Sequence, residues 1–259
     1  MREEKEKRKG WPEKTAAKAG KACFRLLFPE GIYCISCGRP ILPAWEDSLC
    51  PDCRKVIFEN RGGRCPRCGR PMEGWKSHGL CPDCRHCLPL YSRGKTCCVY
   101  KGRVKGILYD FKYGGKAFLA RPLAFLMAEE GFDPAAYDLI LPVPMAKAKM
   151  RRRGYNQAAL LGRELGRLTG KPCEEDILIR NRETAPMSGL SREERRENLK
   201  DAICVTKPRA LLGKRVLLVD DIYTTGATMG ACSQAVLSAG AKEVFALTFA
   251  MASPEKGIV

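Results

Sequence analysis

Short apolar runs alternate with helical patterns along the chain from about Tyr91 onward. Runs with the continuous apolar character of strands buried on both faces occupy residues 138–143, 176–179, 216–219 and 244–249. Between these runs, Leu, Ala and Val recur at helical spacing over residues 156–168 and 228–239. Strands and helices that alternate in this way predict an α/β fold in which a parallel sheet is flanked by helices.

The chain before Tyr91 has a different texture. Residues 1–21 mix Lys, Arg and Glu without an apolar stripe, which predicts a flexible basic tail and, less favoured, a nucleic-acid arm. Residues 22–29 form a short apolar stretch that we expect to pack onto the module that follows. We therefore divide the chain into a tail (1–21), a cysteine-rich module (22–90) and an α/β domain (91–259). The sequence contains neither a membrane span nor a secretory signal, which predicts a cytoplasmic protein.

The composition adds a strong positive charge to this picture. The 259 residues include 46 Lys and Arg against 29 Asp and Glu, a formal net charge of +17. Such a charge favours phosphate-bearing partners, whether a nucleotide, a nucleic acid or an anionic surface, without choosing among them. With 45% apolar residues the chain is neither collagen-like nor wholly disordered.

Most of the 15 cysteines belong to one module, and eight of them form an internal repeat. A shift of 31 residues superposes two copies, and both contain Leu-Cys-Pro-Asp-Cys-Arg. Each copy reads Cys-x2-Cys, twelve residues, Cys-x2-Cys, the spacing of a zinc ribbon in which four thiolates surround Zn²⁺. The predicted ligands of two structural zinc ions are Cys34, Cys37, Cys50 and Cys53 in the first copy and Cys65, Cys68, Cys81 and Cys84 in the second.

The alternatives for these cysteines are disulfides, an iron–sulfur cluster or reduced structural thiols. A reducing compartment and the ribbon spacing favour zinc over all three. Pairing within each copy is the preferred arrangement, but pairs interleaved across the copies satisfy the same chemistry. His86 and Cys87 are left out of the ligand set because the first copy has Lys55 and Val56 at these positions.

A second chemical pattern follows the apolar run 216–219. The run leads into Asp220 and Asp221, then a loop from Thr224 to Thr228, then a predicted helix. We expect the two acids at the carboxyl end of a buried strand, where open α/β sheets bind their ligands. Loop N–H groups at a helix N-terminus can hold a phosphate, and adjacent carboxylates can accept hydrogen bonds from vicinal sugar hydroxyls. This combination fits a ribose 5-phosphate. The alternative, that the segment is only a buried strand followed by an ordinary turn, is less favoured.

This segment resembles the motif that binds 5-phosphoribosyl 1-diphosphate (PRPP) in type I phosphoribosyltransferases, with Tyr223 at a position that is often aliphatic. With the double zinc ribbon, the chain resembles the ComF family, which includes the ComFC competence proteins of bacteria. The residues that carry this resemblance are Leu141 to Pro144, Arg153 to Gln157, Arg192, Arg195, Asn198 and Asp220 to Thr228. It implies a type I phosphoribosyltransferase fold after the zinc ribbons.

The resemblance also implies roles for individual residues. It implies that Mg²⁺ accompanies PRPP, and that Arg182 and Arg192 act in catalysis from a mobile loop near residues 182–191, together with Asp220 and Asp221. The implied PRPP-binding residues are Asp220, Asp221, Thr224, Thr225, Gly226, Ala227, Thr228, Pro144, Arg152 and Arg153, with Lys147 as a further cation for pyrophosphate. Met187 stands where relatives commonly carry glutamine. No residue identifies the acceptor substrate or an obvious general base.

A competing function belongs to another class. The resemblance links the family to handling of single-stranded DNA in natural transformation, together with a competence helicase partner. The basic run from Lys147 to Arg153 is of a kind that usually forms a solvated face, and the alternatives are a pyrophosphate site and a nucleic-acid contact. Aromatic residues can stack bases, but we interpret Tyr91, Tyr100, Tyr109, Phe111 and Tyr113 as core and strand residues. The intact acidic pair favours a PRPP-binding phosphoribosyltransferase; the alternative is a non-catalytic DNA-binding competence protein that uses the pocket as a sensor or DNA site.

Overall fold

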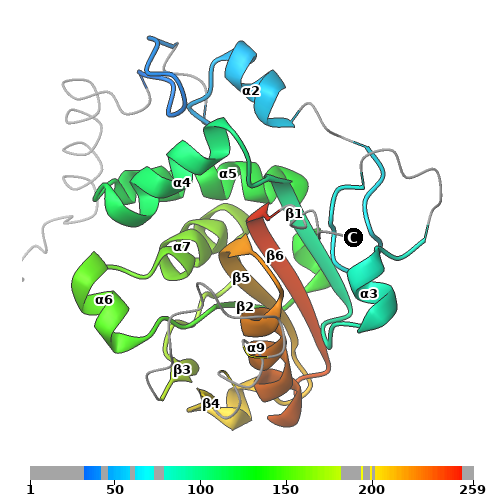
Figure 1. Ribbon diagram of the computed structural model, residues 1–259. Coiled ribbons are helices and arrows are strands. Elements are labelled where there is room, and N and C mark those ends of the chain that lie inside the picture. Colours follow the sequence, from blue (N-terminus) through cyan, green and yellow to red (C-terminus); the bar gives the residue numbers. More distant parts are fainter. Residues whose placement is uncertain are drawn as a thin grey trace, which may run out of the picture.

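A computed structural model describes residues 32–41, 46–58, 62–72, 79–181, 194, 199 and 202–252 of the chain (Figure 1). The predicted tail 1–21, the apolar stretch 22–29 and the predicted loop residues 182–191 lie outside the described residues. So does Arg192, which means that neither this arginine nor Arg182 can be placed. In the described part of the chain, no helix has the length and apolar character needed to cross a membrane.

A four-stranded sheet forms the centre of the molecule. Its strands are β1 (Arg93–Val99), β2 (Leu139–Pro142), β5 (Arg215–Tyr223) and β6 (Glu243–Met251), in the order β1-β6-β5-β2. Every neighbouring pair is parallel. The inner strands β5 and β6 are apolar almost throughout because both of their faces are covered. The predicted parallel sheet is therefore confirmed.

Helices cover both faces of this sheet (Figure 1). On one face, α4 (Arg103–Tyr113), α5 (Ala120–Glu130) and α7 (Gln157–Thr169) share a hydrophobic cluster with Leu217 and Val219 of β5. On the other face, α9 (Ala227–Ser238) shares a cluster with Val216 and Leu218. The alternation follows from the twofold side-chain period of a strand. The remaining elements are α2 (Pro51–Phe58), α3 (Pro82–His86), α6 (Lys147–Arg153), η1 (Ala117–Leu119), η2 (Pro134–Ala136) and η3 (Pro208–Leu211).

Two parts of the sequence interpretation of the strands need correction. The run 176–179 does not join the parallel sheet; its end forms β3 (Leu178–Arg180), which pairs antiparallel with β4 (Ile203–Val205). The physical reason is one-sided burial, since Leu178 is buried whereas Ile179 is 40% exposed. The edge strand β1 was not predicted because it opens with Arg-Gly-Lys-Thr, which carries no continuous apolar run.

The second ribbon covers the outer edge of β1. Arg64 donates hydrogen bonds to the carbonyls of Thr96 (2.6 Å) and Cys97 (3.1 Å). The backbone of Gly69 approaches Gly94 so closely that a Cβ at position 69 would lie 2.6 Å from the Gly94 carbonyl oxygen. An exposed edge strand presents unpaired backbone groups, and here the ribbon satisfies several of them.

The first ribbon packs against the helices instead. Its cysteines and the α2 residues Ile57 and Phe58 belong to the same hydrophobic cluster as α4 and α5. Arg54 of α2 pairs with Glu129 of α5 at 2.9 Å. The two ribbons thus contact different parts of the α/β domain.

Candidate functional site

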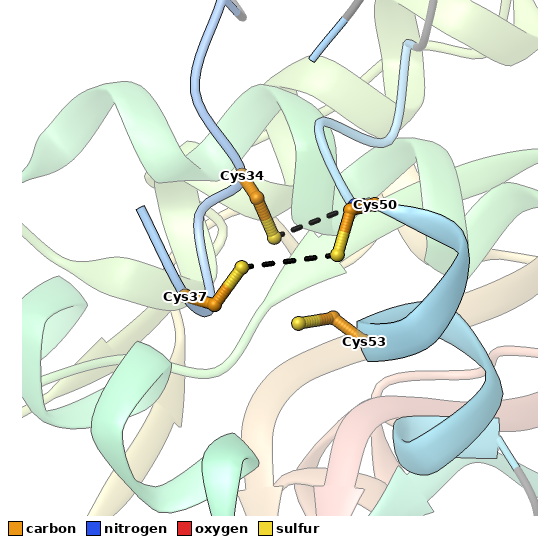
Figure 2. Close-up of side chains that lie close together, drawn as sticks. All are labelled: Cys34, Cys37, Cys50 and Cys53. Carbon is orange, nitrogen blue, oxygen red and sulfur yellow. Dashed lines mark hydrogen bonds between the residues drawn. The ribbon is translucent and has the colours of Figure 1, made fainter. Parts of the chain in front are cut away.

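Two groups of four cysteines are assembled within the described residues, and each group comes from one copy of the repeat. The ligand atoms within each group lie within 4.8 Å of one another. Figure 2 shows the first group, in which the Sγ atoms of Cys37 and Cys50 are 3.8 Å apart. A tetrahedron with Zn–S bonds of about 2.3 Å has sulfur atoms about 3.8 Å apart, so the groups fit Zn²⁺. The structure therefore selects pairing within each copy.

Local backbone geometry prepares these thiols for a metal. Gly38 and Gly69 have φ values of +72° and +74°, which let the chain reverse after each first Cys-x2-Cys pair. The backbone N–H groups of Cys50 and Cys81 each donate to a sulfur of the same group at 3.4 Å. The hydrogen bond with Cys68 lowers the pKa of the Cys81 thiol to about 5. Four-cysteine sites with no open position are typical of structural zinc.

The acidic pair, Asp220 and Asp221, lies on β5 of the central sheet. The strand continues through Tyr223, so Asp220 and Asp221 lie inside it and do not follow it as the sequence predicted. Consecutive strand residues point to opposite faces, which places Asp220 on the α9 side and Asp221 on the α4 side. Both aspartates are still among the last four residues of β5, at the carboxyl edge of the sheet, where a ligand is expected.

The two carboxyl groups differ in their electrostatic surroundings. Asp221 is 6% exposed and forms an ion pair with Lys112 of α4, with 2.9 Å between Nζ and Oδ1. Burial raises the pKa of Asp220 to about 7, and the charge of Asp221 adds to this effect. Lys112 and Arg153 oppose it. One carboxylate thus has a lysine as its direct partner, whereas the pKa of the other is raised to about 7.

The loop after β5 leads directly into the N-terminus of α9. Gly226 adopts φ +80° at the start of α9 and contributes no side chain to cap the helix. The N-terminal N–H groups of the helix therefore face the loop that contains Thr224 and Thr225, and the helix dipole favours negative charge there. Thr224 is exposed, and Ala227 begins the helix with its side chain buried. Residues 224–228 are the predicted phosphate loop, and their role in binding phosphate stays a prediction.

A basic segment follows β2 at the same edge. Pro144 is buried, and α6 begins three residues later with Lys147 exposed to solvent. Arg152 is also exposed, whereas the Arg153 guanidinium is committed to Gln157 (2.9 Å) and to the Tyr113 hydroxyl (3.0 Å). Arg153 therefore joins α4, α6 and α7 in this structure.

Sequence reasoning did not predict Lys112. Its position depends on α4, whose end is held by Tyr155, which donates to the Phe111 carbonyl at 2.6 Å. Gln157 donates to the same carbonyl at 3.4 Å. The pattern Arg-Gly-Tyr-Asn-Gln was recognised in the sequence, but no local signal connects it with residues more than forty positions earlier.

The interpretation of the aromatic residues was correct only in part. Tyr91 and Phe111 are buried, as expected for core residues. Tyr109 and Tyr113 are 63% and 56% exposed, and their ring centroids lie 5.2 Å apart on the surface of α4. They are one helical turn apart, so they form a surface pair instead of alternating in a strand.

Comparison with known proteins shows which family this chain resembles. A family model described as a double zinc ribbon domain matches residues 23–85. The chain is 33% identical over 145 residues to Competence protein F of Haemophilus influenzae, which covers 53% of this chain and 63% of that protein. It is 30% identical over 162 residues to DNA utilization protein YhgH of Escherichia coli O157:H7, covering 60% and 70%. The chain belongs to the ComF family.

The match spans somewhat less than two thirds of Competence protein F. Among solved structures, a purine phosphoribosyltransferase from Pyrococcus horikoshii is similar, with 24% identity, a TM-score of 0.32, and coverage of 55% of this chain and 78% of that one. In this member of the ComF family, the described residues comprise a double zinc ribbon joined to a parallel sheet that is flanked by helices.

Proposed function

We propose that this ComF protein binds PRPP together with Mg²⁺ at the carboxyl edge of its sheet. The observation that carries the proposal is the strand-to-helix segment at β5 and α9, where two carboxyl groups lie beside a glycine-started helix N-terminus. A carboxylate pair next to a phosphate seat matches the sugar hydroxyls and the 5-phosphate of one ligand. A protein that bound only nucleic acid would have no use for the Asp220 and Asp221 carboxylates in a basic site, because they repel phosphate groups.

Each part of the site receives a role under this proposal. Asp220 and Asp221 accept hydrogen bonds from the ribose hydroxyls, and Thr224 to Thr228 hold the 5-phosphate. Pro144 shapes the turn that leads to α6, and Arg152, Lys147 and Lys112 are the cations on the side where pyrophosphate would lie. Mg²⁺ would neutralise part of the pyrophosphate charge. Arg182 and Arg192 keep the catalytic roles that the resemblance implies.

The proposed chemistry is transfer of the phosphoribosyl group. The bond between C1 of ribose and the pyrophosphate oxygen breaks, and pyrophosphate leaves with the electron pair. A nucleophile, whose identity the site does not specify, forms the new bond to C1 and loses its proton. Positive charge develops at C1 in such a step, so the protein would act by stabilising pyrophosphate and excluding water.

Calorimetric titration of the zinc-loaded chain with Mg–PRPP tests the proposal. We expect micromolar binding that is lost when Asp220→Asn and Asp221→Asn are combined, with zinc content and circular dichroism unchanged. Asp133→Asn is the matched control, because this exposed aspartate only caps η2 and should leave the affinity within about twofold. Unchanged affinity in the double variant would overturn the site assignment. Pyrophosphate release with a panel of bases and amines then tests transfer.

A second function is favoured by the exposed tyrosine pair. Arg153 of α6 lies over Tyr113, with its guanidinium carbon 4.8 Å from the ring centroid, and Tyr109 contacts the Tyr113 ring. Aromatic faces flanked by cations are typical of surfaces that stack single-stranded nucleic acid. We therefore propose single-stranded DNA as the alternative ligand of this surface, with the helicase partner and cytoplasmic location as predictions from the family resemblance.

Fluorescence anisotropy with a labelled oligonucleotide tests this alternative. Binding should weaken steeply as salt rises from 50 to about 200 mM, because phosphate contacts release counterions. Tyr109→Ala should weaken binding about tenfold, in line with the loss of one stacked base. Tyr33→Ala removes an equally exposed tyrosine from the first ribbon and serves as the control. A flat salt response or equal effects of the two substitutions would exclude this surface as the DNA site.

A further inference from the structure

We infer that Tyr91 is a positioning residue for the phosphate loop, and that the second zinc ribbon sets the geometry of this loop through the hydrogen-bonded pair Tyr91–Tyr223. The inference rests on the proposed function, because the loop is the predicted seat of the 5-phosphate. It assigns to the second ribbon a role that the first ribbon does not share.

The contact begins at the second zinc group. Arg67 lies between Cys65 and Cys68, and its guanidinium donates to the carbonyls of Pro89 (2.7 Å) and Ser92 (2.9 Å). These two carbonyls flank Tyr91 along the chain. The backbone N–H of Ser92 in turn donates to the Val244 carbonyl of β6 at 2.8 Å. Arg67 of the second ribbon and Val244 of β6 therefore together fix the backbone around Tyr91.

Tyr91 then reaches β5. Its side chain is 1% exposed, and its hydroxyl donates to the Tyr223 hydroxyl at 3.0 Å. The two rings meet edge to face, with centroids 6.5 Å apart and planes at 83°. Both tyrosines pack in the cluster that contains Cys68 and Cys84 of the second ribbon. Packing against the fully buried Tyr91 ring leaves the half-buried Tyr223 little freedom to change rotamer.

The last contact joins Tyr223 to the phosphate loop. A Cβ built on Gly226 would lie 2.1 Å from the Tyr223 hydroxyl oxygen, so the bare glycine backbone rests directly on the phenol tip. Gly226 is also the residue whose positive φ begins α9. The phenol therefore supports the turn that aims the first N–H groups of α9. The aromatic residue at position 223 is explained by this support, since a typical aliphatic side chain has no hydroxyl to meet Tyr91.

The first ribbon makes no such connection among the described residues, because it packs on α4 and α5 at the other face. It reaches α4 through Arg103, which donates to the Cys53 sulfur at 3.4 Å. Loss of the two metals should therefore have different consequences. Loss of the second zinc should loosen the phosphate loop, whereas loss of the first should leave the loop unchanged.

Titration of single variants with Mg–PRPP and with ribose 5-phosphate tests the role of the pair. Tyr91→Phe removes one hydroxyl and keeps the ring, and we expect about three- to tenfold weaker binding of both ligands. Tyr223→Phe should have the same effect, and the two substitutions together should cost no more than either alone. Tyr137→Phe alters another fully buried tyrosine, at the far end of the sheet, and should change affinity less than about twofold. Additive losses, or no loss, would overturn the inference.

A spectroscopic measurement separates this inference from the proposed function. In the chain labelled with 3-fluorotyrosine, the ¹⁹F resonance of Tyr223, assigned with Tyr223→Phe, should shift when Cys68→Ser removes the second zinc. The equivalent first-ribbon variant, Cys37→Ser, should leave this resonance in place. Equal responses, or none, would overturn the coupling even if PRPP binds. If the wild-type chain does not bind PRPP but the resonance responds only to the second zinc, the proposed function fails and the coupling stands. If Cys68→Ser does not fold, the Tyr91→Phe series still decides.

Discussion

The acidic pair shows how two neighbouring residues acquire different properties. Asp220 and Asp221 belong to one strand, so their side chains face opposite layers of helices. On the α4 side, Lys112 compensates Asp221 within hydrogen-bond distance. On the α9 side, the half-buried Asp220 lies near the Cys232 thiol, without a cation in direct contact among the described ion pairs. Two neighbouring aspartates therefore differ: Asp221 has a lysine partner, and the pKa of Asp220 is raised.

Asp220 should make stability depend on pH. Its pKa of about 7 in the folded chain lies above the ordinary value near 4, so its contribution to stability is fully present below about pH 4 and is lost as pH rises through about 7. Because asparagine does not titrate, Asp220→Asn removes this pH-dependent loss of stability. Between pH 5.5 and 8, the variant should gain stability relative to the wild type, by at most about 1.4 kcal/mol per pH unit. Urea unfolding at several pH values measures the difference; a difference that is independent of pH would contradict the assignment.

The ion pair of Lys112 should matter for stability. Lys112→Met leaves the buried Asp221 carboxylate without its cation, and we expect a loss of about 3 kcal/mol in the free energy of unfolding. Adding Asp221→Asn should recover part of the loss. Lys116→Met is the matched control on the same side of the molecule, because its pair with Asp110 is exposed and should be worth less than about 1 kcal/mol. Similar losses in both lysine variants would argue against a special pair at Asp221.

At the scale of elements, the turn between α6 and α7 holds the carboxyl edge of the sheet together. Asn156 caps α7 by accepting from the Ala158 N–H at 3.1 Å, and its amide nitrogen donates to the Val143 carbonyl at 3.0 Å. Tyr155 and Gln157 hold the end of α4 from the same turn. Three helices and the loop after β2 therefore share one short segment.

Removal of this cap should be measurable. Asn156→Ala loses both the capping bond and the bond to Val143, and we expect a loss of about 1 to 2 kcal/mol in unfolding free energy. Urea denaturation followed by circular dichroism gives this value. Asp133→Ala removes the cap of the short, exposed η2 and should cost less. A loss in Asn156→Ala no larger than in this control would show that the bond to Val143 contributes nothing.

At the scale of the whole molecule, the zinc ribbons are part of the hydrophobic core. Cysteines of the first ribbon share a cluster with α4, α5 and β6, and those of the second share one with β5, β6 and α9. The second ribbon also bonds the outer edge of the sheet through Arg64, and Arg70 donates to the Ala252 carbonyl after β6. A metal that orders the ribbons should therefore stabilise the sheet as well.

Zinc removal should consequently lower the stability of the entire chain. The purified protein should contain about two zinc ions per chain. A strong chelator should lower the melting temperature of the sheet, followed by far-ultraviolet circular dichroism, and added zinc should restore it. Melting of the sheet at an unchanged temperature after complete zinc loss would show that the ribbons fold as independent appendages.

The sequence by itself determined the features whose chemistry is local. Four cysteines at ribbon spacing can close around one metal whatever surrounds them, and the copies of the repeat made the two zinc groups predictable. The strand, turn and glycine of the segment from Val216 to Thr228 are also specified over a few residues, so the sequence alone was enough to propose a phosphate site there. The strands of the parallel sheet were predicted where the sequence is continuously apolar, and β1 was missed because it opens with the polar run Arg-Gly-Lys-Thr.

Only the tertiary structure decided the contacts between segments that are distant along the chain. Lys112 meets Asp221, Tyr91 meets Tyr223, and Arg64 meets the edge of β1, and none of these residues carries a local signal of its partner. The exposure of Tyr109 and Tyr113 likewise followed from which face of α4 turned to the core. The physical reason is that periodicity specifies which residues share a face, whereas the packing of the whole chain decides what that face meets.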